Sequence, residues 1–190
     1  LDKKIDISLL YGFSIQEIDK NNLYPISSFN KFLGEVKHHS VLPRKNSTFF
    51  HEYYPSGCAL MFHKSFFRHI GFFDDDLFLF GEEIDLSMRL KNKNLCFTIL
   101  ENITITHSSG SSRNFSTSNH EKEFLRKFSL YNIHRSYLIL FYKYFYARIF
   151  FYRIILFGKF LKALIIRDKV SSKFLFFLIF SSLDTLYKSN

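Results

Sequence analysis

Six carboxylate side chains are concentrated in a stretch that is otherwise rich in Phe and Leu, GFFDDDLFLFGEEIDLSMRL, at residues 71–90. They form two groups on either side of an apolar run: Asp74, Asp75 and Asp76 before it, and Glu82, Glu83 and Asp85 after it. Like charges this close repel, and a carboxylate beside buried aromatic rings is costly to keep ionised unless other groups compensate it. A fold that keeps this stretch must therefore either expose the acids to water or use them.

Local signals allow a purely structural explanation of both groups. The first group is typical of a turn. The second would complement the dipole of a helix that runs from Glu82 to Lys91. Arg89 follows Asp85 by one helical turn, so these two side chains can form an ion pair. The residues alone leave the structural and the functional explanation open.

Several short motifs surround this stretch in a definite order. They are SGCA at residues 56–59, GFFDD at 71–75, FGEEIDLSMR at 80–89 and, after a strand-like segment, HSSGSS at 107–112. In this order and spacing they resemble the C-terminal half of the catalytic domain of family 2 glycosyltransferases, especially the bacterial rhamnosyltransferase-like group. The resemblance implies an α/β fold, namely the C-terminal portion of a GT-A (Rossmann-like) domain over residues 1–120.

The resemblance also implies catalytic carboxylates. Glu83 matches the residue expected to deprotonate the acceptor hydroxyl, and Glu82 is the other member of the family's acidic pair. Asp85 matches the second acid of the motif, which shapes the acceptor site. The family commonly has Asp where this chain has Glu83, so the carboxylate lies one methylene further from the backbone.

Further residues are implied to bind the donor. His107 matches a histidine that joins a divalent metal beside the diphosphate, and imidazole is a more usual ligand for Mn²⁺ than for Mg²⁺. Gly57, Gly110 and Ser111 are expected to bind substrate, the last two by bringing backbone N–H groups close to phosphate. A strand-end histidine bonded only to the backbone remains the alternative for His107.

The reaction implied is an inverting transfer of a sugar, such as rhamnose, from a nucleotide-sugar donor to a glycan or a lipid-linked acceptor in cell-surface polysaccharide biosynthesis. The family's nucleotide-binding half, with its Asp-x-Asp motif, precedes the matched segment. Asp74–Asp76 satisfies that motif literally but stands at the position of GFFDD, so it is not assigned the metal. We therefore expect this chain to lack the donor half, and a non-catalytic, membrane-surface binding remnant of such an enzyme is the alternative function.

Charge separates the last third of the chain from the rest. Residues 1–123 carry 14 Lys/Arg and 15 Asp/Glu, whereas residues 124–190 carry 12 Lys/Arg against two Asp, and 19 of these 67 residues are Phe or Tyr. Basic, aromatic helices are typical of the surface of an anionic membrane. Residues 121–190 are therefore predicted to be a helical tail on the cytoplasmic, inner face of the cell membrane. Helical cover for the sheet and a nucleic-acid surface are the alternatives, the latter not expected because the aromatic content exceeds what phosphate contacts need.

Hydrophobic patterns and turn residues predict the secondary structure. Helices are expected at residues 64–70, ended by Gly71, and at 82–91. Adjacent His38 and His39 should point apart, which argues against a shared metal. Cys58 and Cys96 are expected to be buried free thiols. Strands are expected at residues 4–11, 57–62 (buried), 95–100 and 103–106, the last two joined by a turn at 101–102, with a turn at 19–22 and long loops at 30–47 and 108–118.

Overall fold

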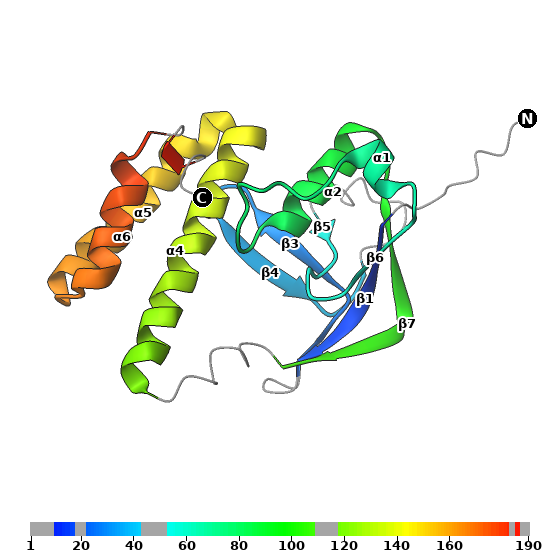
Figure 1. Cartoon of the computed structure of the whole chain (residues 1–190), viewed down its shortest axis with the longest axis horizontal. Helices are drawn as coiled ribbons and strands as arrows, with labels where there is room; N and C mark the ends of the chain where they lie inside the picture. The colour runs from blue at the N-terminus through cyan, green and yellow to red at the C-terminus, as the bar shows by residue number, and fades with distance from the viewer. Residues whose placement is uncertain (1–9, 18–21, 43–52, 109–117, 183–184, 187–190) are drawn as a thin grey trace, which may run out of the picture. The chain divides into compact units, whose positions relative to one another are not determined.

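A computed structural model describes residues 10–17, 22–42, 53–108, 118–182 and 185–186 of the 190-residue chain (Figure 1). It is a mixed α/β protein with two compact units. The first, the sheet unit, comprises residues 1–29, 36–73 and 83–109. The second, the helical unit, comprises residues 30–35, 74–82 and 110–190.

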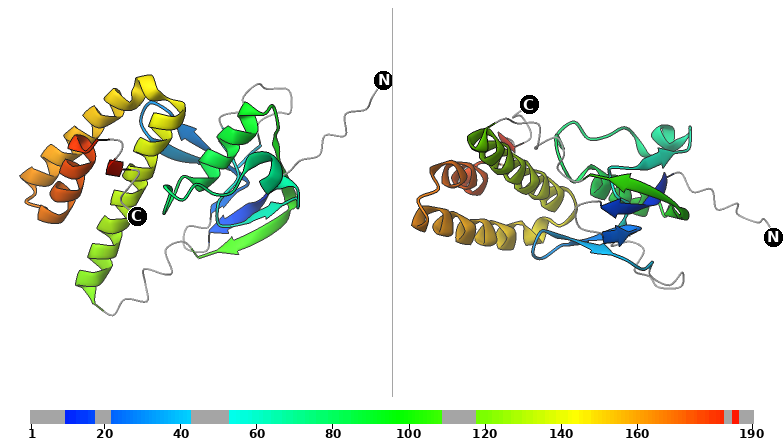
Figure 2. Two further views of the ribbon diagram at one scale, coloured as in Figure 1. Left: turned by 45° about the horizontal axis from the view of Figure 1, so that its top comes forward. Right: turned by 90° about the horizontal axis from the view of Figure 1, so that it is seen from below.

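Strand β1 (Leu10–Glu17) is the centre of the main sheet. On one side it pairs in parallel with β7 (Phe97–His107), and on the other it pairs antiparallel with β6 (Leu60–Phe62) and then β2 (Asn22–Tyr24). Figure 2 shows β7 lying along β1. Of the predicted strand at residues 4–11, residues 4–9 lie outside the described residues, and residues 10 and 11 belong to β1, which continues to Glu17. The turn predicted at 19–22 falls largely outside the described residues.

Strand β7 is continuous but irregular. Leu100 is opposite Phe13, and the next pair is Thr104 opposite Ser14, so residues 101–103 are extra on this strand. The prediction of two strands joined by a turn was wrong: the residues taken for a turn form a bulge, after which pairing with β1 resumes.

A second sheet has the order β4–β3–β5, with β3 at Ile26–Asn30, β4 at Glu35–His39 and β5 at Tyr53–Tyr54. The prediction of a long loop at 30–47 was thus wrong for residues 35–39; residues 43–47 lie outside the described part. The turn between β3 and β4 is built by Asn30, whose Oδ1 accepts hydrogen bonds from Phe32 N (2.9 Å) and Leu33 N (3.1 Å). Gly34 completes it with a φ of 63°, a value that glycine adopts without steric cost.

His38 and His39 point apart on β4, as predicted. His38 Nδ1 lies 2.7 Å from Ser27 Oγ, and His39 Nε2 lies 2.7 Å from Ser28 Oγ. Each imidazole also packs on a tyrosine, His38 on Tyr24 and His39 on Tyr53. These contacts give the two rings separate structural roles.

Two helices complete the sheet unit. α1 (Phe66–Ile70) ends at Gly71, which has a φ of 90°, and α2 (Glu82–Asn92) ends in a Schellman motif in which Leu95 N donates to Leu90 O (2.9 Å). Both helix predictions are confirmed. Strand β6 is shorter and more exposed than the predicted buried strand, since Met61 is 45% exposed. The core of this unit consists of Leu10, Ile26, Phe66, Ile70, Leu86, Leu90 and Phe97.

The helical unit contains α4 (Asn119–Tyr144), a short 3₁₀ turn η2 (Tyr146–Arg148), α5 (Ile149–Ile165) and α6 (Lys169–Phe180). The predicted change to helix near residue 121 is confirmed. Ser118 caps α4 by accepting from Glu121 N (3.1 Å). α5 and α6 lie side by side as an antiparallel pair (Figures 1 and 2), because Arg167 takes a φ of 58° and Asp168 N donates to Ala163 O (2.8 Å) to end α5.

Candidate functional site

The candidate site lies at the carboxyl ends of the two parallel strands of the sheet unit. β1 ends at Glu17 and β7 ends at His107, and these two residues are partners in the strand register. Residues paired across strands project from the same face of a sheet. Glu17 is buried and His107 is half-buried. The prediction that His107 stands at a strand end is confirmed, and the structure adds Glu17 as its neighbour.

Tyr24 joins the same face through strand β2. It is the partner of Ile15, which is two residues before Glu17 and therefore faces the same side. Burial raises the pKa of the Tyr24 hydroxyl. A hydrogen bond with Ser56 acts in the opposite direction, and the charges of Glu17 and Glu83 raise the pKa further. Tyr24 is thus close enough to both carboxylates for their charges to act on it.

Glu83 reaches this region from the first turn of α2, where a carboxylate also complements the helix dipole. Its side chain lies directly over Gly57: a Cβ atom added to Gly57 would be 3.1 Å from Glu83 Oε2 and 3.3 Å from Cδ. The structure therefore brings together two residues predicted from separate motifs, the acid and the small residue. Glu83 is half-buried and Gly57 is exposed, so solvent reaches this contact.

Asp85 has a different environment from Glu83. It is fully buried and accepts a hydrogen bond from Arg89 Nε at 2.8 Å, while Arg89 Nη1 donates to Ile70 O at 2.8 Å. The predicted Asp85–Arg89 pair is confirmed, and it ties α2 to the end of α1. The burial of Asp85 favours a structural role over contact with substrate. Glu82 is half-buried at the first position of the helix.

The first acidic group belongs to the helical unit and is explained by structure. Asp74 Oδ1 accepts from Asp76 N (3.0 Å) in a turn, and Asp74 Oδ2 pairs with Lys143 Nζ (2.7 Å). Burial raises the pKa of Asp76, with Asp74 adding to the effect. The turn suggested for this group is confirmed.

The described residues offer few possible metal ligands near His107. No cluster of three or more His, Cys, Asp or Glu that could hold a metal ion occurs among the residues that the structure describes. His107 and Glu17 would supply one nitrogen and one oxygen ligand, which suits a metal whose remaining ligands come from phosphate and water. The two other predicted donor-binding residues, Gly110 and Ser111, lie outside the described residues.

Glu17 and Tyr24 were not found by sequence analysis. Both reach the site through strand pairing between distant segments, and no local motif marks either one. The only signal was chemical: Glu17 is an acid at the end of a strand in which Leu10 and Ile15 are buried. Cys58 was expected to be buried and is exposed; Cys96 is intermediate, and both are free thiols.

A second surface is found on α5 of the helical unit. The helix buries Tyr152, Leu156 and Ala163 on one face. The opposite face is apolar too and is exposed. Phe150, Ile154, Phe157, Leu161 and Leu164 follow one another at intervals of three or four residues, and Ile165 extends the face at its C-terminal end. We call these six residues the outer stripe of α5; Ile165 is 81% exposed. A helix that is apolar on its solvent side as well as its core side is typical of an interaction surface.

No helix in the described part of the chain is long and apolar enough to cross a membrane. Comparison of the sequence with protein-family models, and of the chain with curated proteins and solved structures, gave no match.

Proposed function

We propose that the sheet unit is the acceptor-side half of a GT-A glycosyltransferase domain that transfers a sugar, such as a rhamnosyl group, from a nucleotide sugar to a glycan or lipid-linked acceptor. The observation that supports this most is the contact between Glu83 and Gly57, in the region of Tyr24, because these residues come from separate motifs that resemble one family. The reaction needs a base for the acceptor hydroxyl and a group near the leaving diphosphate.

In this proposal Glu83 is the base. It stands at the solvent-accessible end of α2, so an acceptor hydroxyl can approach it, whereas Asp85 is fully buried. Tyr24, which is hydrogen-bonded with Ser56, is close enough to Glu83 for the carboxylate to raise the pKa of its hydroxyl. His107 and Glu17, at the ends of the parallel strands, are the groups that would hold a Mg²⁺ or Mn²⁺ ion, which would neutralise the leaving diphosphate.

The test is the substitution Glu83→Gln in the full-length protein, assayed for transfer from a panel of nucleotide sugars that includes a rhamnosyl donor. A general base contributes about 10²–10⁴-fold to the rate, so kcat should fall by that factor. Glu123→Gln, the same chemical change at an exposed position of α4, is the matched control and should leave the rate unchanged. Activity of Glu83→Gln within a few-fold of the parent would exclude Glu83 as the base.

A second candidate function, supported by the outer stripe, is binding to the inner face of an anionic membrane. Apolar side chains at the lipid boundary and Lys/Arg near head groups act together at such surfaces. This function would persist in a non-catalytic remnant of the enzyme. It predicts binding to anionic vesicles that weakens with salt without vanishing, since salt screens charge and leaves apolar burial intact.

Flotation of the full chain with vesicles tests this second function. Phe157→Ser removes a ring from the stripe and should reduce recovery with anionic vesicles, whereas Phe124→Ser, an exposed ring on α4 outside the stripe, should not. Equal recovery with neutral and anionic vesicles would contradict the electrostatic part, and no recovery with either would contradict membrane binding.

A further inference from the structure

The helical unit contains a pocket of about 250 Å³ among α4, α5 and α6. Its charged lining is mainly basic, with Arg126, Lys127, Lys159 and Lys162 against Asp168. The rest of the lining is largely apolar and includes Leu130, Leu175, Leu178 and Ile166. The pocket thus combines a cluster of positive charge with an apolar wall.

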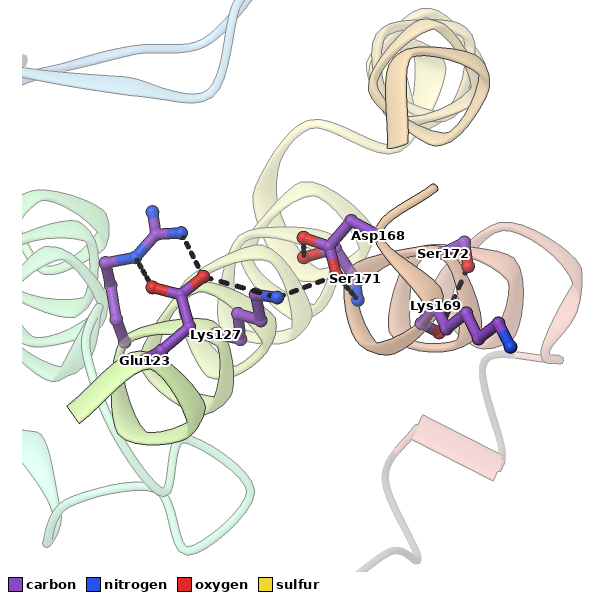
Figure 3. A network of polar contacts seen from close by, with 7 residues as sticks. Glu123, Lys127, Asp168, Lys169, Ser171 and Ser172 are labelled. Atoms are coloured by element: carbon purple, nitrogen blue, oxygen red, sulfur yellow. Dashed lines mark hydrogen bonds and ion pairs between the residues drawn. The ribbon is translucent and has the colours of Figure 1, made fainter. Parts of the chain in front are cut away.

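Two of the four cations are already neutralised within the fold. Arg126 donates to both carboxylate oxygens of Glu123, at 3.0 and 2.8 Å. Lys127 Nζ lies between two carboxylates, 2.8 Å from Asp168 Oδ1 and 3.2 Å from Glu123 Oε1 (Figure 3). This bridge holds Lys127 in place and joins α4 to α6. Because two carboxylates already neutralise its ammonium group, Lys127 would attract an added anion only weakly.

Lys159 and Lys162 differ from this first pair. They are three residues apart on α5 and therefore project from the same side of the helix. Among the described residues neither is within ion-pair distance of a carboxylate; Lys159 Nζ instead lies 3.4 Å from His134 Nε2. Burial lowers the pKa of Lys159, and Glu35 offsets this only in part. An anion placed between the two ammonium groups would supply the missing charge.

His134 cannot compensate Lys159. Burial and the neighbouring Lys159 lower the pKa of its imidazole to about 3, so the ring is neutral at pH 7. Its Nδ1 is hydrogen-bonded with the Tyr152 hydroxyl at 2.7 Å. Since the Lys159 ammonium can only donate, Nε2 accepts and Nδ1 carries the proton that is donated to Tyr152. His134 therefore contributes a hydrogen-bond acceptor to Lys159 and no negative charge.

We propose that this pocket binds a phosphate group that carries an apolar chain, with Lys159 and Lys162 contacting the phosphate and the Leu and Ile side chains of the wall contacting the chain. The charge of the two lysines matches a phosphate, and the apolar wall distinguishes such an amphiphile from a free phosphate ion. The inference deepens the proposed membrane function, on which it rests for the source of the lipid, by assigning one headgroup site to it.

The experiment distinguishes binding of a phosphate-bearing amphiphile from binding of a different headgroup and from binding of phosphate alone. The full chain is titrated calorimetrically with three soluble probes: dihexanoyl phosphatidic acid below its micelle concentration, dihexanoyl phosphatidylcholine and inorganic phosphate. Phosphatidic acid should bind at least about tenfold more tightly than either of the others, since about 1.4 kcal/mol corresponds to a factor of ten. Phosphate that binds as tightly as phosphatidic acid would overturn the amphiphile assignment, and binding of neither would overturn the site.

Variants locate the binding. Lys159→Met with Lys162→Met should weaken phosphatidic acid binding by at least tenfold, and Lys162→Met alone, at an exposed residue, tests the site without disturbing packing. The matched control is Lys173→Met, an exposed lysine of α6 that does not line the pocket. Equal losses in Lys162→Met and Lys173→Met would overturn the proposal in favour of general attraction.

The same titration distinguishes failure of the pocket from failure of the membrane function. Phe157→Ser should lose vesicle binding while retaining binding of soluble phosphatidic acid, because Phe157 does not line the pocket. The double lysine variant should lose soluble phosphatidic acid binding whether or not it still floats with vesicles. If both variants retain soluble phosphatidic acid binding, the pocket is not its site.

Discussion

Replacing Asp168 by Asn should destabilise the helical unit at neutral pH and leave it nearly unchanged at pH 2. Asp168 has two roles. It caps α6 by accepting from Ser171 N (3.1 Å) and Ser171 Oγ (2.8 Å), and it pairs with Lys127 Nζ (2.8 Å). Asn is as good an N-cap as Asp, so Asp168→Asn removes the charge and keeps the cap.

The magnitude follows from the pKa of Asp168. Burial alone would raise it, but the hydrogen bonds from Lys127 and Ser171 outweigh burial and hold the pKa at about 2, against an ordinary value of 3.8. A difference of about 1.8 pKa units corresponds to about 2.5 kcal/mol. Solvent reaches part of the pair, since the side chains of Lys127 and Asp168 are 14% and 16% exposed. We therefore expect a loss of about 1–2 kcal/mol.

The sign of the pH dependence is fixed by the direction of the shift. A carboxylate whose pKa is lowered on folding contributes stability above its unfolded value of 3.8, and this contribution is lost as the pH falls toward 2. Urea unfolding followed by far-UV circular dichroism at pH 7 and at pH 2 measures it. With a slope of about 2 kcal/mol/M, the midpoint should fall by about 0.5–1 M at pH 7.

A matched variant tests whether the Lys127–Asp168 ion pair is the cause of the lost stability. Lys127→Met breaks the same ion pair from α4 and keeps the cap, so it should cost a similar amount at pH 7. If Asp168→Asn is as destabilising at pH 2 as at pH 7, the ion pair is not the cause. An unchanged midpoint at pH 7 would equally refute the reasoning.

Four other outcomes are expected. Arg89→Met leaves the buried Asp85 without its ion-pair partner and should lower the free energy of unfolding by about 3–5 kcal/mol, with part of the loss recovered in the double variant Asp85→Leu/Arg89→Met. His134 binds protons less readily when folded, with a pKa of about 3 against 6.5, so stability should fall as the pH drops from 6.5 toward 3, by about 4 kcal/mol in total; His134→Gln should flatten this part of the profile in acid titrations. Gly158→Ala on α5, where an added Cβ meets nothing within 4 Å, should raise the thermal midpoint through a gain of about 0.5–1 kcal/mol. Gly57→Ala should displace Glu83 by a few tenths of an ångström, which transfer kinetics would detect as a lower kcat at unchanged thermal stability.

The parts of the fold that could be predicted from the sequence are those that a local rule decides. Gly71 ends α1, Glu82 and Glu83 begin α2, and Arg89 pairs with Asp85, and each of these depends on residues within one or two helical turns. The basic aromatic tail was assigned to helices for the same reason. Glu83 and Gly57 were each implied by the resemblance to a family, but their contact was not predicted, since no local rule joins residues 26 positions apart.

The parts that could not be predicted are those that depend on pairing between strands. β4 is exposed along most of its length, so it lacks the alternation that marks a half-buried strand, and it was assigned to a loop. Glu17 and Tyr24 reach the candidate site only through the register of β1 with β7 and β2. Residues 101 and 102 look like a turn by composition, and only the partner strand reveals that they are a bulge.

That bulge has a consequence for the way β7 can vary. Side chains alternate between the two faces of a strand, so the face on which a residue lies depends on whether an odd or an even number of residues precedes it. Three extra residues are an odd number, and they reverse the alternation between Leu100 and His107 relative to β1. His107 lies on the face of Glu17 because pairing resumes after the bulge with these two residues opposite each other. A deletion within 101–103 that the bulge absorbs would keep this register and the face of the imidazole, whereas a deletion that shifts the downstream register by one residue would move the imidazole to the opposite face. The bulge can thus change in length without moving the histidine, provided that the pairing on its C-terminal side is kept.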